Sequence, residues 1–171
     1  MLIIDQTYED MSILCGMASD DTIFEMYKQA KIEYPDADII IKTHPDNKKG
    51  HFSKFMPDDN VYLFCDYINP ISLLECVDVV YVCTSQMGFE ACMCGKEVHV
   101  FGMPFYAGWG FTQDRQKCNR RVRRRTVEEV FYFAYIMYSH YVSYRTNSAC
   151  DIETCISEIL ELRDEYFSLS H

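Results

Sequence analysis

The stretch VDVVYVCTSQMGFEACMCGKEVHVFGMPFYAGWG, residues 77–110, decides the fold that we expect for this chain. Its first seven residues form a short β-branched run, which is typical of a strand buried on both faces of a parallel sheet. A turn at residues 84–88, a short helical segment ending at Gly95 and a second strand at residues 98–101 follow. The pattern therefore predicts an α/β fold with a parallel sheet.

The turn at residues 84–88 lies where such sheets bind ligands, which is outside the carboxyl ends of the strands. The first amides of the following helix, with the hydroxyls of Thr84 and Ser85, would hold a phosphate or carboxylate. Glu90 could accept hydrogen bonds from sugar hydroxyls. In the alternative, Ser85 is only an N-cap and Glu90 only an acid favoured by the helix dipole. Spacing alone leaves both interpretations open.

The composition indicates one globular domain, because 171 residues with 49% hydrophobic content are enough to bury a sizeable core. No run approaches the ~20 apolar residues of a membrane span, and no basic leader opens the sequence, so we expect a cytoplasmic protein. The nine cysteines are odd in number and form no C-x-x-C pair. We expect them to be reduced core residues, with no metal site.

The net charge of −10 argues against general nucleic-acid binding. The local charge is positive in one segment, RQKCNRRVRRR at residues 115–125, which carries seven basic residues. We call it the basic run. Such a run usually forms a solvated face, and we favour that interpretation. It could also contact an anionic acceptor or anionic lipid at the inner face of the inner membrane, as a peripheral membrane contact.

Polar clusters also follow the other predicted strands. The strand at residues 2–4 leads into DQTYEDMS, residues 5–12, whose three carboxylates could serve as acid, base or nucleophile. Loops are also commonly acidic for solubility alone. Because this loop follows a strand end, we expect it at the same sheet edge as the turn at residues 84–88.

A third cluster follows the strand at residues 39–41. Lys42 and His44 come directly after this strand, and Pro45 tends to hold the backbone of His44 extended. A lone histidine is more often a structural hydrogen-bonding residue than a catalyst. A histidine before proline at a strand end, with a lysine nearby, favours a functional role.

Helical patterns separate the strands. One helix of about a dozen residues is expected to begin at Asp20 or Asp21, and its apolar positions recur at helical spacing: Ile23, Phe24, Tyr27, Ala30 and Ile32. Another begins after the strand at residues 61–64, with Asn69 as its cap and Pro70 at its first position. Strands alternating with helices predict a Rossmann-like parallel sheet with helices on both faces.

Two helices are expected after this α/β core. Residues 127–144 form a long helical pattern crowded with aromatic residues, and a second amphipathic helix is expected from Asp151 or Ile152 to about Tyr166. We therefore predict a single domain over residues 1–171, with the α/β core at residues 1–125 and aromatic-rich C-terminal helices at residues 126–171.

Four segments of this sequence are similar to those of one family: DQTYEDMSI, KTHPD, TSQMGFEA and HVFGMPFYAGWG. They lie in order over most of the chain, and the sequence resembles the bacterial capsule polysaccharide β-Kdo glycosyltransferases. These enzymes use a CMP-activated eight-carbon keto sugar acid, CMP-Kdo. The resemblance implies one half of a two-domain GT-B architecture, namely the carboxyl-terminal, donor-binding half.

The resemblance also implies roles for individual residues. Asp10 would be the catalytic carboxylate of a Q-x-x-x-D-x-S element, and His44 would match the catalytic histidine of a His-Pro element. The residues expected to bind the donor are Gln6, Ser12, Lys42, Pro45, Thr84, Ser85, Gln86, Gly88 and Glu90. No cofactor is expected besides the donor substrate itself.

The implied reaction is retaining transfer, in which a carboxylate displaces CMP and an acceptor hydroxyl then displaces the carboxylate. The acceptor would be a glycolipid or Kdo-terminated glycan, held mainly by an amino-terminal half that we expect to be absent from this chain or supplied by a partner chain. Two alternatives remain open. The chain could be a stand-alone nucleotide-binding or interaction module without catalysis, or part of a GT-B enzyme that uses a UDP sugar.

Overall fold

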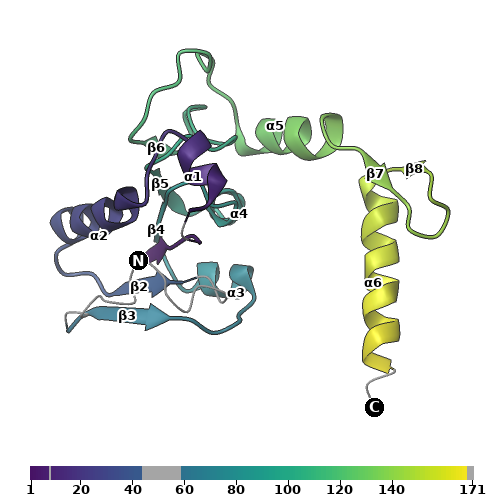
Figure 1. Cartoon of the computed structure of the whole chain (residues 1–171), viewed down its shortest axis with the longest axis horizontal. Coiled ribbons are helices and arrows are strands. Elements are labelled where there is room, and N and C mark those ends of the chain that lie inside the picture. Colours follow the sequence, from purple (N-terminus) through teal and green to yellow (C-terminus); the bar gives the residue numbers. More distant parts are fainter. Residues whose placement is uncertain (8, 44–58, 169–171) are drawn as a thin grey trace. The chain divides into compact units, whose positions relative to one another are not determined.

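The computed structural model describes residues 1–7, 9–43 and 59–168 (Figure 1). The chain divides into two compact units, Met1–Val127 and Glu128–His171. The first unit contains the α/β part, and the second contains short strands and helices of its own.

The first unit is built on a parallel sheet. Among the described residues this sheet has six strands, in the order β3-β2-β1-β4-β5-β6, and every neighbouring pair is parallel. In chain order the strands are β1 (Leu2–Ile4), β2 (Ile39–Lys42), β3 (Val61–Phe64), β4 (Val79–Val82), β5 (Glu97–Val100) and β6 (Gln113–Asp114). The α/β fold with a Rossmann-like parallel sheet is confirmed.

Four helices connect the strands of the described part of this unit: α1 (Met11–Cys15), α2 (Asp21–Glu33), α3 (Pro70–Glu75) and α4 (Met87–Met93). The start of α3 is as predicted, because the Asn69 side chain accepts a hydrogen bond from the amide of Ile71 at 2.9 Å. Pro70 fills the first helical position, where its missing N–H costs nothing.

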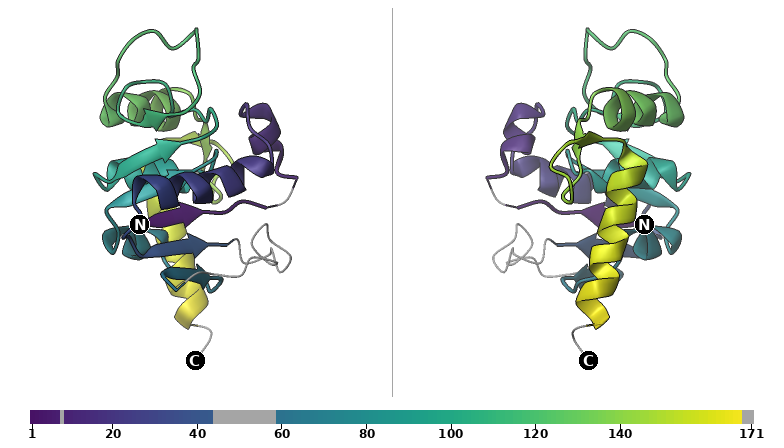
Figure 2. Two further views of the ribbon diagram at one scale, coloured as in Figure 1. Left: turned by 90° about the vertical axis from the view of Figure 1, so that its left-hand side faces the viewer. Right: turned by 90° about the vertical axis from the view of Figure 1, so that its right-hand side faces the viewer.

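Helices cover both faces of the sheet (Figures 1 and 2). Side chains of consecutive strand residues point to opposite faces, so a strand such as β4 packs against helices on both sides. On one face Tyr81 belongs to a buried cluster with Met26 and Ala30 of α2. On the other face Val82 lies under α4, and α3 and α4 pack against each other. Burial of a larger apolar side chain such as Met26 or Val82 contributes about 1.5–3 kcal/mol to the stability of the fold.

The apolar pattern of α2 differs from the expectation at one residue. Ile23, Met26 and Ala30 are fully buried, but the Ile32 side chain is 72% exposed. Ile32 lies two positions beyond Ala30, which is about 200° around the helix axis and therefore on the opposite face. The prediction that Ile32 belongs to the apolar face was wrong.

The carboxyl-terminal end of α2 is tied to the sheet by a polar cluster around Glu33. Arg115 Nη2 donates to both carboxylate oxygens of Glu33, at 2.7 and 2.8 Å, and the Tyr81 hydroxyl also donates to Glu33. Arg115 Nη2 further donates to His99 Nδ1 at 2.9 Å, so the proton of the imidazole lies on Nε2, which donates to Glu97 at 2.8 Å. The cluster joins α2 to β4, β5 and the first arginine of the basic run.

This cluster predicts a loss of stability in acid. Burial opposes ionisation of Glu33, but hydrogen bonds from Tyr81, Gln29 and Arg115 lower its pKa from 4.5 to about 2. A carboxylate whose pKa is lower in the folded than in the unfolded chain stabilises the fold above the unfolded pKa. That contribution is lost as the pH falls from 4.5 towards about 2. Chemical denaturation at pH 6 and at pH 3 should therefore show a smaller acid-induced loss for Glu33→Gln than for the unsubstituted chain.

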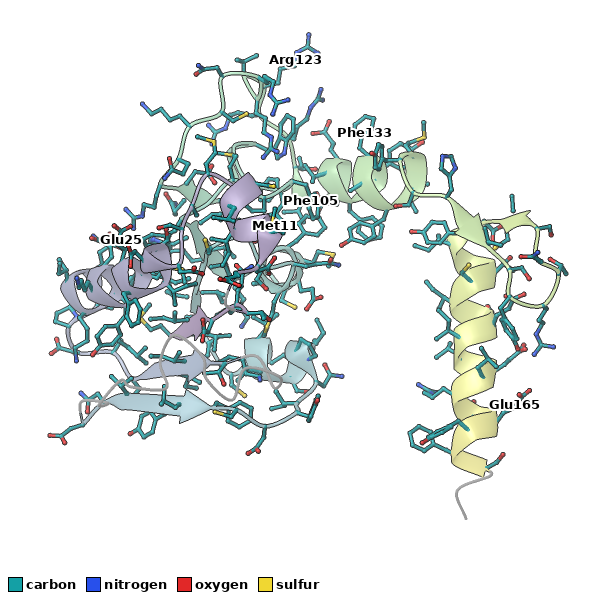
Figure 3. All side chains as sticks on the ribbon, viewed as in Figure 1. Met11, Glu25, Phe105, Arg123, Phe133 and Glu165 are labelled. Atoms are coloured by element: carbon teal, nitrogen blue, oxygen red, sulfur yellow. The ribbon has the colours of Figure 1, made fainter. Side chains whose placement is uncertain are left out.

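Glu25 provides the matched control, because it is an exposed acid on the same helix and points outward (Figure 3). Glu25→Gln should keep the pH dependence of the unsubstituted chain. An equal acid-induced loss in Glu33→Gln and the unsubstituted chain would contradict the assignment of this loss to Glu33.

The second unit differs from the expected pair of long helices. α5 (Val127–Phe131) passes into a π-helix, η1 (Tyr132–Met137), and the chain then forms a hairpin of β7 (Tyr141–Val142) and β8 (Ala149–Cys150) before α6 (Ile152–Ser168). The prediction of one helix over residues 127–144 was wrong, and the prediction of a helix beginning at Ile152 is confirmed.

Local hydrogen bonds explain where the first helical segment ends. The amide of Tyr138 donates to the carbonyl of Phe133 at 2.9 Å, and the Ser139 hydroxyl donates to the carbonyl of Ala134 at 2.8 Å. These wider contacts satisfy the last helical carbonyls without a further α-turn. Buried Glu158 of α6 then holds the hairpin, because its carboxylate accepts from the Ser143 hydroxyl at 2.6 Å.

In the described part of the chain, no helix is long and apolar enough to cross a membrane.

Candidate functional site

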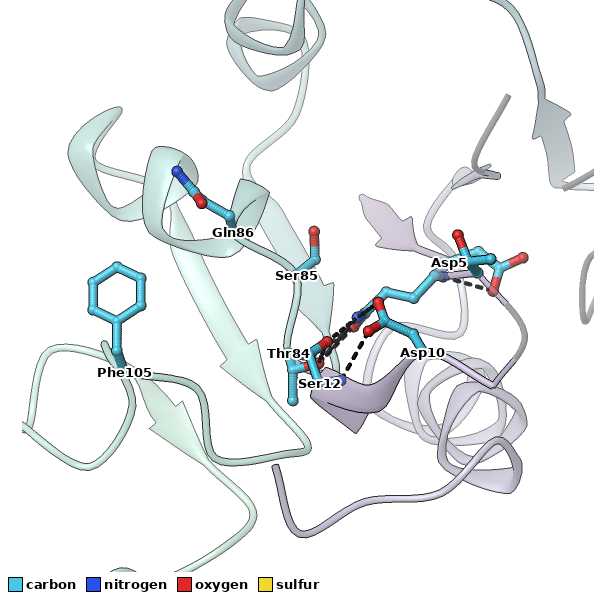
Figure 4. A pocket seen from close by; sticks show the side chains of 9 residues that line it. Asp5, Asp10, Ser12, Thr84, Ser85, Gln86 and Phe105 are labelled. Carbon is cyan, nitrogen blue, oxygen red and sulfur yellow. Dashed lines mark hydrogen bonds between the residues drawn. The ribbon is translucent and has the colours of Figure 1, made fainter. Parts of the chain in front are cut away.

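A cavity of about 380 Å³ lies at the carboxyl ends of β1 and β4 (Figure 4). These two strands are neighbours at the point where the strand order reverses, and this is where open parallel sheets bind their ligands. The cavity is lined by Asp5, Gln6, Thr7, Asp10, Ser12, Thr84, Ser85, Gln86 and Phe105. Two segments that are far apart in the sequence thus form one site, as the strand pattern predicts.

Gln6 connects the two segments. Its side-chain Nε2 lies 3.1 Å from Asp10 Oδ2, 3.2 Å from Ser12 Oγ and 3.0 Å from Thr84 Oγ1, and these three acceptors share its two hydrogens. Its carbonyl oxygen accepts from the backbone amide of Thr84 at 2.7 Å. Gln6 is 6% exposed, and its bonds to Thr84 are buried, whereas those to Asp10 and Ser12 are partly buried. These bonds hold the β1 and β4 loops together.

Asp10 is held from two sides. It is the N-cap of α1, with Oδ1 accepting from the amide of Ser12 at 2.8 Å, while Oδ2 faces the Gln6 amide. The sequence predicts only a polar loop here, and the structure shows that the loop ends in a five-residue helix. Hydrogen bonds to both oxygens fix the orientation of the carboxylate.

Thr84 is held in place by two glycines. A Cβ atom on Gly16 would lie 2.4 Å from Thr84 Cγ2, and one on Gly102 would lie 2.7 Å from the same atom. The methyl group of Thr84 therefore occupies space that any larger residue at either position would take. This packing directs Thr84 Oγ1 towards Gln6 and Ser12, whose hydroxyl lies 3.0 Å away. Sequence reasoning gave neither glycine this role.

Ser85 takes part in the local structure of the turn. Its hydroxyl accepts from the amide of Met87 at 3.3 Å, and its carbonyl accepts from the Tyr106 hydroxyl at 2.5 Å. The amides of Gly88 and Phe89 donate to the carbonyls of Ser85 and Gln86. The N-cap of α4 is Gln86, whose side chain makes no capping hydrogen bond, while the Ser85 hydroxyl bonds the first helical amide. A phosphate cradle at these amides stays a prediction.

Gly88 is required for close packing of the turn. A Cβ atom at Gly88 would lie 2.2 Å from the Tyr106 hydroxyl oxygen and 2.8 Å from Val82 Cγ2. Its role in the structure is thus to admit the buried Tyr106 side chain. Gly88 does not itself line the cavity.

Phe105 is a lining residue from a third segment of the chain, which sequence reasoning missed. It lies in the loop at residues 102–110, which we call the aromatic loop, and its ring packs edge-on against Phe89 of α4 with centroids 5.1 Å apart. The segment HVFGMPFYAGWG marked this region as distinctive. No periodicity in the sequence indicated that the Phe105 side chain would reach the site at the ends of β1 and β4.

Two predicted donor-binding residues lie away from the cavity lining. Lys42 Nζ donates to the carbonyl of Thr43 at 2.8 Å and lies 5.5 Å from the centre of the Phe64 ring, and burial lowers the pKa of Lys42. Glu90 is partly buried in α4, and this burial raises its pKa. The predicted residues His44 and Pro45 lie outside the described residues.

The basic run is partly engaged with the chain itself. Arg115 pairs with Glu33, Arg121 donates to two carbonyls of the aromatic loop, and Arg124 Nη2 donates to the carbonyl of Gly110 at 3.2 Å. The expectation of a purely solvated face was therefore incomplete. Contact of the basic run with lipid or an anionic acceptor stays a prediction.

The cysteines are less uniform than expected. Cys83 and Cys92 are buried, and burial raises the pKa of each thiol to about 12, but Cys15, Cys65 and Cys76 are exposed. The expectation that the cysteines are core residues was wrong for these three. Within residues 1–7, 9–43 and 59–168, no group of three or more histidine, cysteine or acidic side chains could hold a metal ion.

Known proteins resemble this chain over most of its length. Residues 1–147 match the family described as capsule polysaccharide biosynthesis protein. The capsule polysaccharide modification protein LipA of Neisseria meningitidis serogroup B is 45% identical over 159 residues, which are 87% of this chain and 23% of LipA. The lipopolysaccharide-processing protein LpsZ of Rhizobium meliloti is 38% identical over 163 residues, which are 93% of this chain and 37% of LpsZ.

Two solved structures are also similar, both from Thermosulfurimonas dismutans KpsC. The beta Kdo 2,4 transferase has a TM-score of 0.86 and 45% identity, over 91% of this chain and 50% of that one. The beta Kdo 2,7 transferase has a TM-score of 0.80 and 30% identity, over 95% of this chain and 53% of that one. This chain thus spans about half of these structures and less than half of the curated relatives. The chain belongs to the capsule polysaccharide biosynthesis protein family.

Proposed function

We propose that this chain is the donor-binding part of a retaining β-Kdo transferase that uses CMP-Kdo in capsule polysaccharide synthesis. Membership of the capsule polysaccharide biosynthesis family and the similarity to two Kdo transferase structures support a role of this kind. Since the chain spans about half of each of those structures, the acceptor site would be completed by residues outside it.

One observation carries the proposal: the Gln6 amide joins Asp10, Ser12 and Thr84 at a single cavity. A glycosyl transfer with a covalent intermediate needs an ionised carboxylate in a fixed orientation beside the sugar. It also needs polar groups on the opposite wall that can contact the nucleotide. Asp10 supplies the first from the β1 side, and the Thr84–Gln86 turn supplies the second from the β4 side.

The reaction would proceed in two displacements at the anomeric carbon of Kdo. In the first, an Asp10 oxygen forms a bond to this carbon as the bond to the phosphate oxygen breaks, and CMP leaves with the bonding electrons. In the second, an acceptor hydroxyl oxygen attacks the same carbon, the Asp10 ester breaks, and the hydroxyl proton passes to a base. Two inversions give net retention.

Within this scheme Asp10 is the nucleophile and Gln6 and Ser12 hold it in place. Ser85 and Gln86 line the cavity on the side proposed for CMP. His44, with Pro45, is proposed to stabilise the leaving phosphate. Lys42 and Glu90 would have to contact more distant parts of the donor, because neither lines the cavity.

The partners follow from the same scheme. The proposed acceptor is a glycolipid or a Kdo-terminated glycan, which an amino-terminal half or a partner chain would hold. Such an acceptor would be anchored at the inner face of the membrane. Contact of the basic run with anionic lipid would then keep the enzyme near its acceptor.

Calorimetric titration with CMP tests the donor site directly. We expect heat of binding for the unsubstituted chain and a loss of that heat for Ser85→Val, because valine removes the hydroxyl that faces the cavity. Ser72→Val is the control, since Ser72 is an exposed serine of α3 away from the cavity. Equal binding of CMP by Ser85→Val and by the unsubstituted chain would remove Ser85 from the donor site, and no binding in either would contradict the proposed function.

A further inference from the structure

We infer that Arg121 is a positioning residue of the donor site, which acts by holding the aromatic loop so that Phe105 forms one wall of the cavity. This inference rests on the proposed function for its effect on donor binding. Its structural part depends only on contacts between the basic run and the loop.

The aromatic loop contributes to the cavity through Phe105, whose ring is 40% exposed. The next residue, Tyr106, is fully buried, and its hydroxyl donates to the carbonyl of Ser85 at 2.5 Å. The loop therefore touches the site twice, with one aromatic residue in the cavity wall and the next against the turn that lines it. Any displacement of the loop moves both contacts.

Arg121 binds the loop on both sides of these aromatic residues. Its Nη1 donates to the carbonyl of Pro104 at 2.5 Å and to that of Ala107 at 2.6 Å. One guanidinium nitrogen carries two hydrogens, so it can satisfy both carbonyls at once. Phe105 and Tyr106 are the two residues between these anchored carbonyls.

Further contacts hold the guanidinium in place. Its Cζ lies 5.4 Å from the centre of the Trp109 ring, and the Trp109 indole N–H donates to the carbonyl of Phe105 at 2.8 Å. Gly108 has a φ of +79°, and a Cβ there would come within 3.3 Å of Arg121 Cδ. The loop thus leaves room for the stem of the arginine and offers its head two carbonyls and an aromatic face.

Lysine would not replace arginine in this role. An ammonium group ends a shorter stem and lacks the planar guanidinium, whose Nη1 reaches both carbonyls while its centre lies over the Trp109 ring. Arg121→Lys therefore separates geometry from charge. If Arg121 acted only by raising the positive potential for an anionic donor, lysine would restore donor binding.

The first test follows the loop itself, without any ligand. Hydrogen exchange of the whole chain, measured by mass spectrometry, should be faster in peptides covering residues 102–110 for both Arg121→Met and Arg121→Lys. Peptides from β4 and β1 should be unchanged. Arg123→Ala is the control, because Arg123 is exposed and projects outward from the same basic run (Figure 3). Unchanged exchange in the loop of both Arg121 variants would overturn the inference.

The second test measures the consequence for the donor. We expect the dissociation constant for CMP to rise about tenfold in Arg121→Met, the size expected for losing a charge-assisted hydrogen bond, and to stay within about twofold in Arg123→Ala. In a Phe105→Ala background, Arg121→Met should cause little further change, because Arg121 acts through Phe105. Additive effects of the two substitutions would overturn the inference.

The outcomes distinguish this inference from the proposed function. If the unsubstituted chain does not bind CMP, the proposed function fails, while the exchange experiment still decides whether Arg121 holds the loop. If Arg121→Met does not fold, hydrogen exchange and CMP affinity are measured with Arg121→Lys instead. The comparison in the Phe105→Ala background then also uses Arg121→Lys. Restored CMP affinity in Arg121→Lys would assign Arg121 an electrostatic role and contradict the positioning role.

Discussion

Asp10→Asn is expected to lower the rate of sugar transfer, measured with the proposed acceptor half present, by at least about a thousandfold, as removal of a covalent nucleophile does in other enzymes. The affinity for CMP should stay within about threefold, because Asp10 is proposed to meet the sugar and not the nucleotide. The measurement is transfer from CMP-Kdo to a Kdo-terminated acceptor, together with calorimetric titration of CMP.

Asparagine is an informative replacement because it separates chemistry from folding. Its side-chain oxygen can still accept from the amide of Ser12 and cap α1. Its NH2 group replaces the Asp10 oxygen that accepts from Gln6, so that hydrogen bond is lost. Glu9→Gln is the control, since Glu9 is the preceding, exposed acid and does not line the cavity. Sustained transfer by Asp10→Asn would rule out Asp10 as the nucleophile.

Gln6→Leu is expected to have the second largest effect, because it breaks the contacts that join the two halves of the site. Leucine leaves the buried amide of Thr84 without its acceptor at 2.7 Å and frees Asp10 from one of its two anchors. An unsatisfied buried donor costs about 1–3 kcal/mol, which corresponds to a fall of several degrees in Tm for a chain of this size. Transfer should fall about a hundredfold, since misplacement of a reacting group by about 1 Å costs that much.

Gln6→Glu is the matched comparison for this prediction. Glutamate keeps an oxygen for the amide of Thr84 but removes the donor to Asp10, Ser12 and Thr84 Oγ1. We expect its Tm to lie above that of Gln6→Leu while its transfer rate is equally low. Normal transfer in both variants, measured at a temperature where both are folded, would show that the Gln6 contacts do not organise the site.

Sequence reasoning succeeded where one short pattern carries the physical constraint. The β-branched runs at residues 39–41 and 77–83 predicted buried parallel strands, because such runs avoid water on both faces. The polar residues after β1 and β4 predicted a shared site, because the carboxyl ends of parallel strands meet at one edge. Asn69 before Pro70 predicted a helix start, because both residues satisfy local backbone requirements.

Sequence reasoning failed where the outcome depends on individual side-chain and backbone contacts that periodicity does not reveal. The aromatic residues after Val127 predicted one long helix, but wider hydrogen bonds end it before the hairpin. The position of Lys42 after a strand did not reveal that its side chain lies over Phe64, and its contact with the donor stays a prediction. Arg121 was counted only as part of a charged run, although its head meets two backbone carbonyls.

The sequence by itself determined the first five strands and the helices α2, α3 and α4 between them, the parallel sheet and the edge at which Asp10 and Thr84 gather, because these follow from periodicity and from local backbone preferences. Only the tertiary structure decided that Gln6 bonds both segments, that Gly16 and Gly102 enclose Thr84, and that Phe105 reaches the cavity. Those features depend on side-chain contacts between separate segments of the chain, such as the contact of Gln6 with Thr84 at a separation of 78, and no local pattern encodes such a contact.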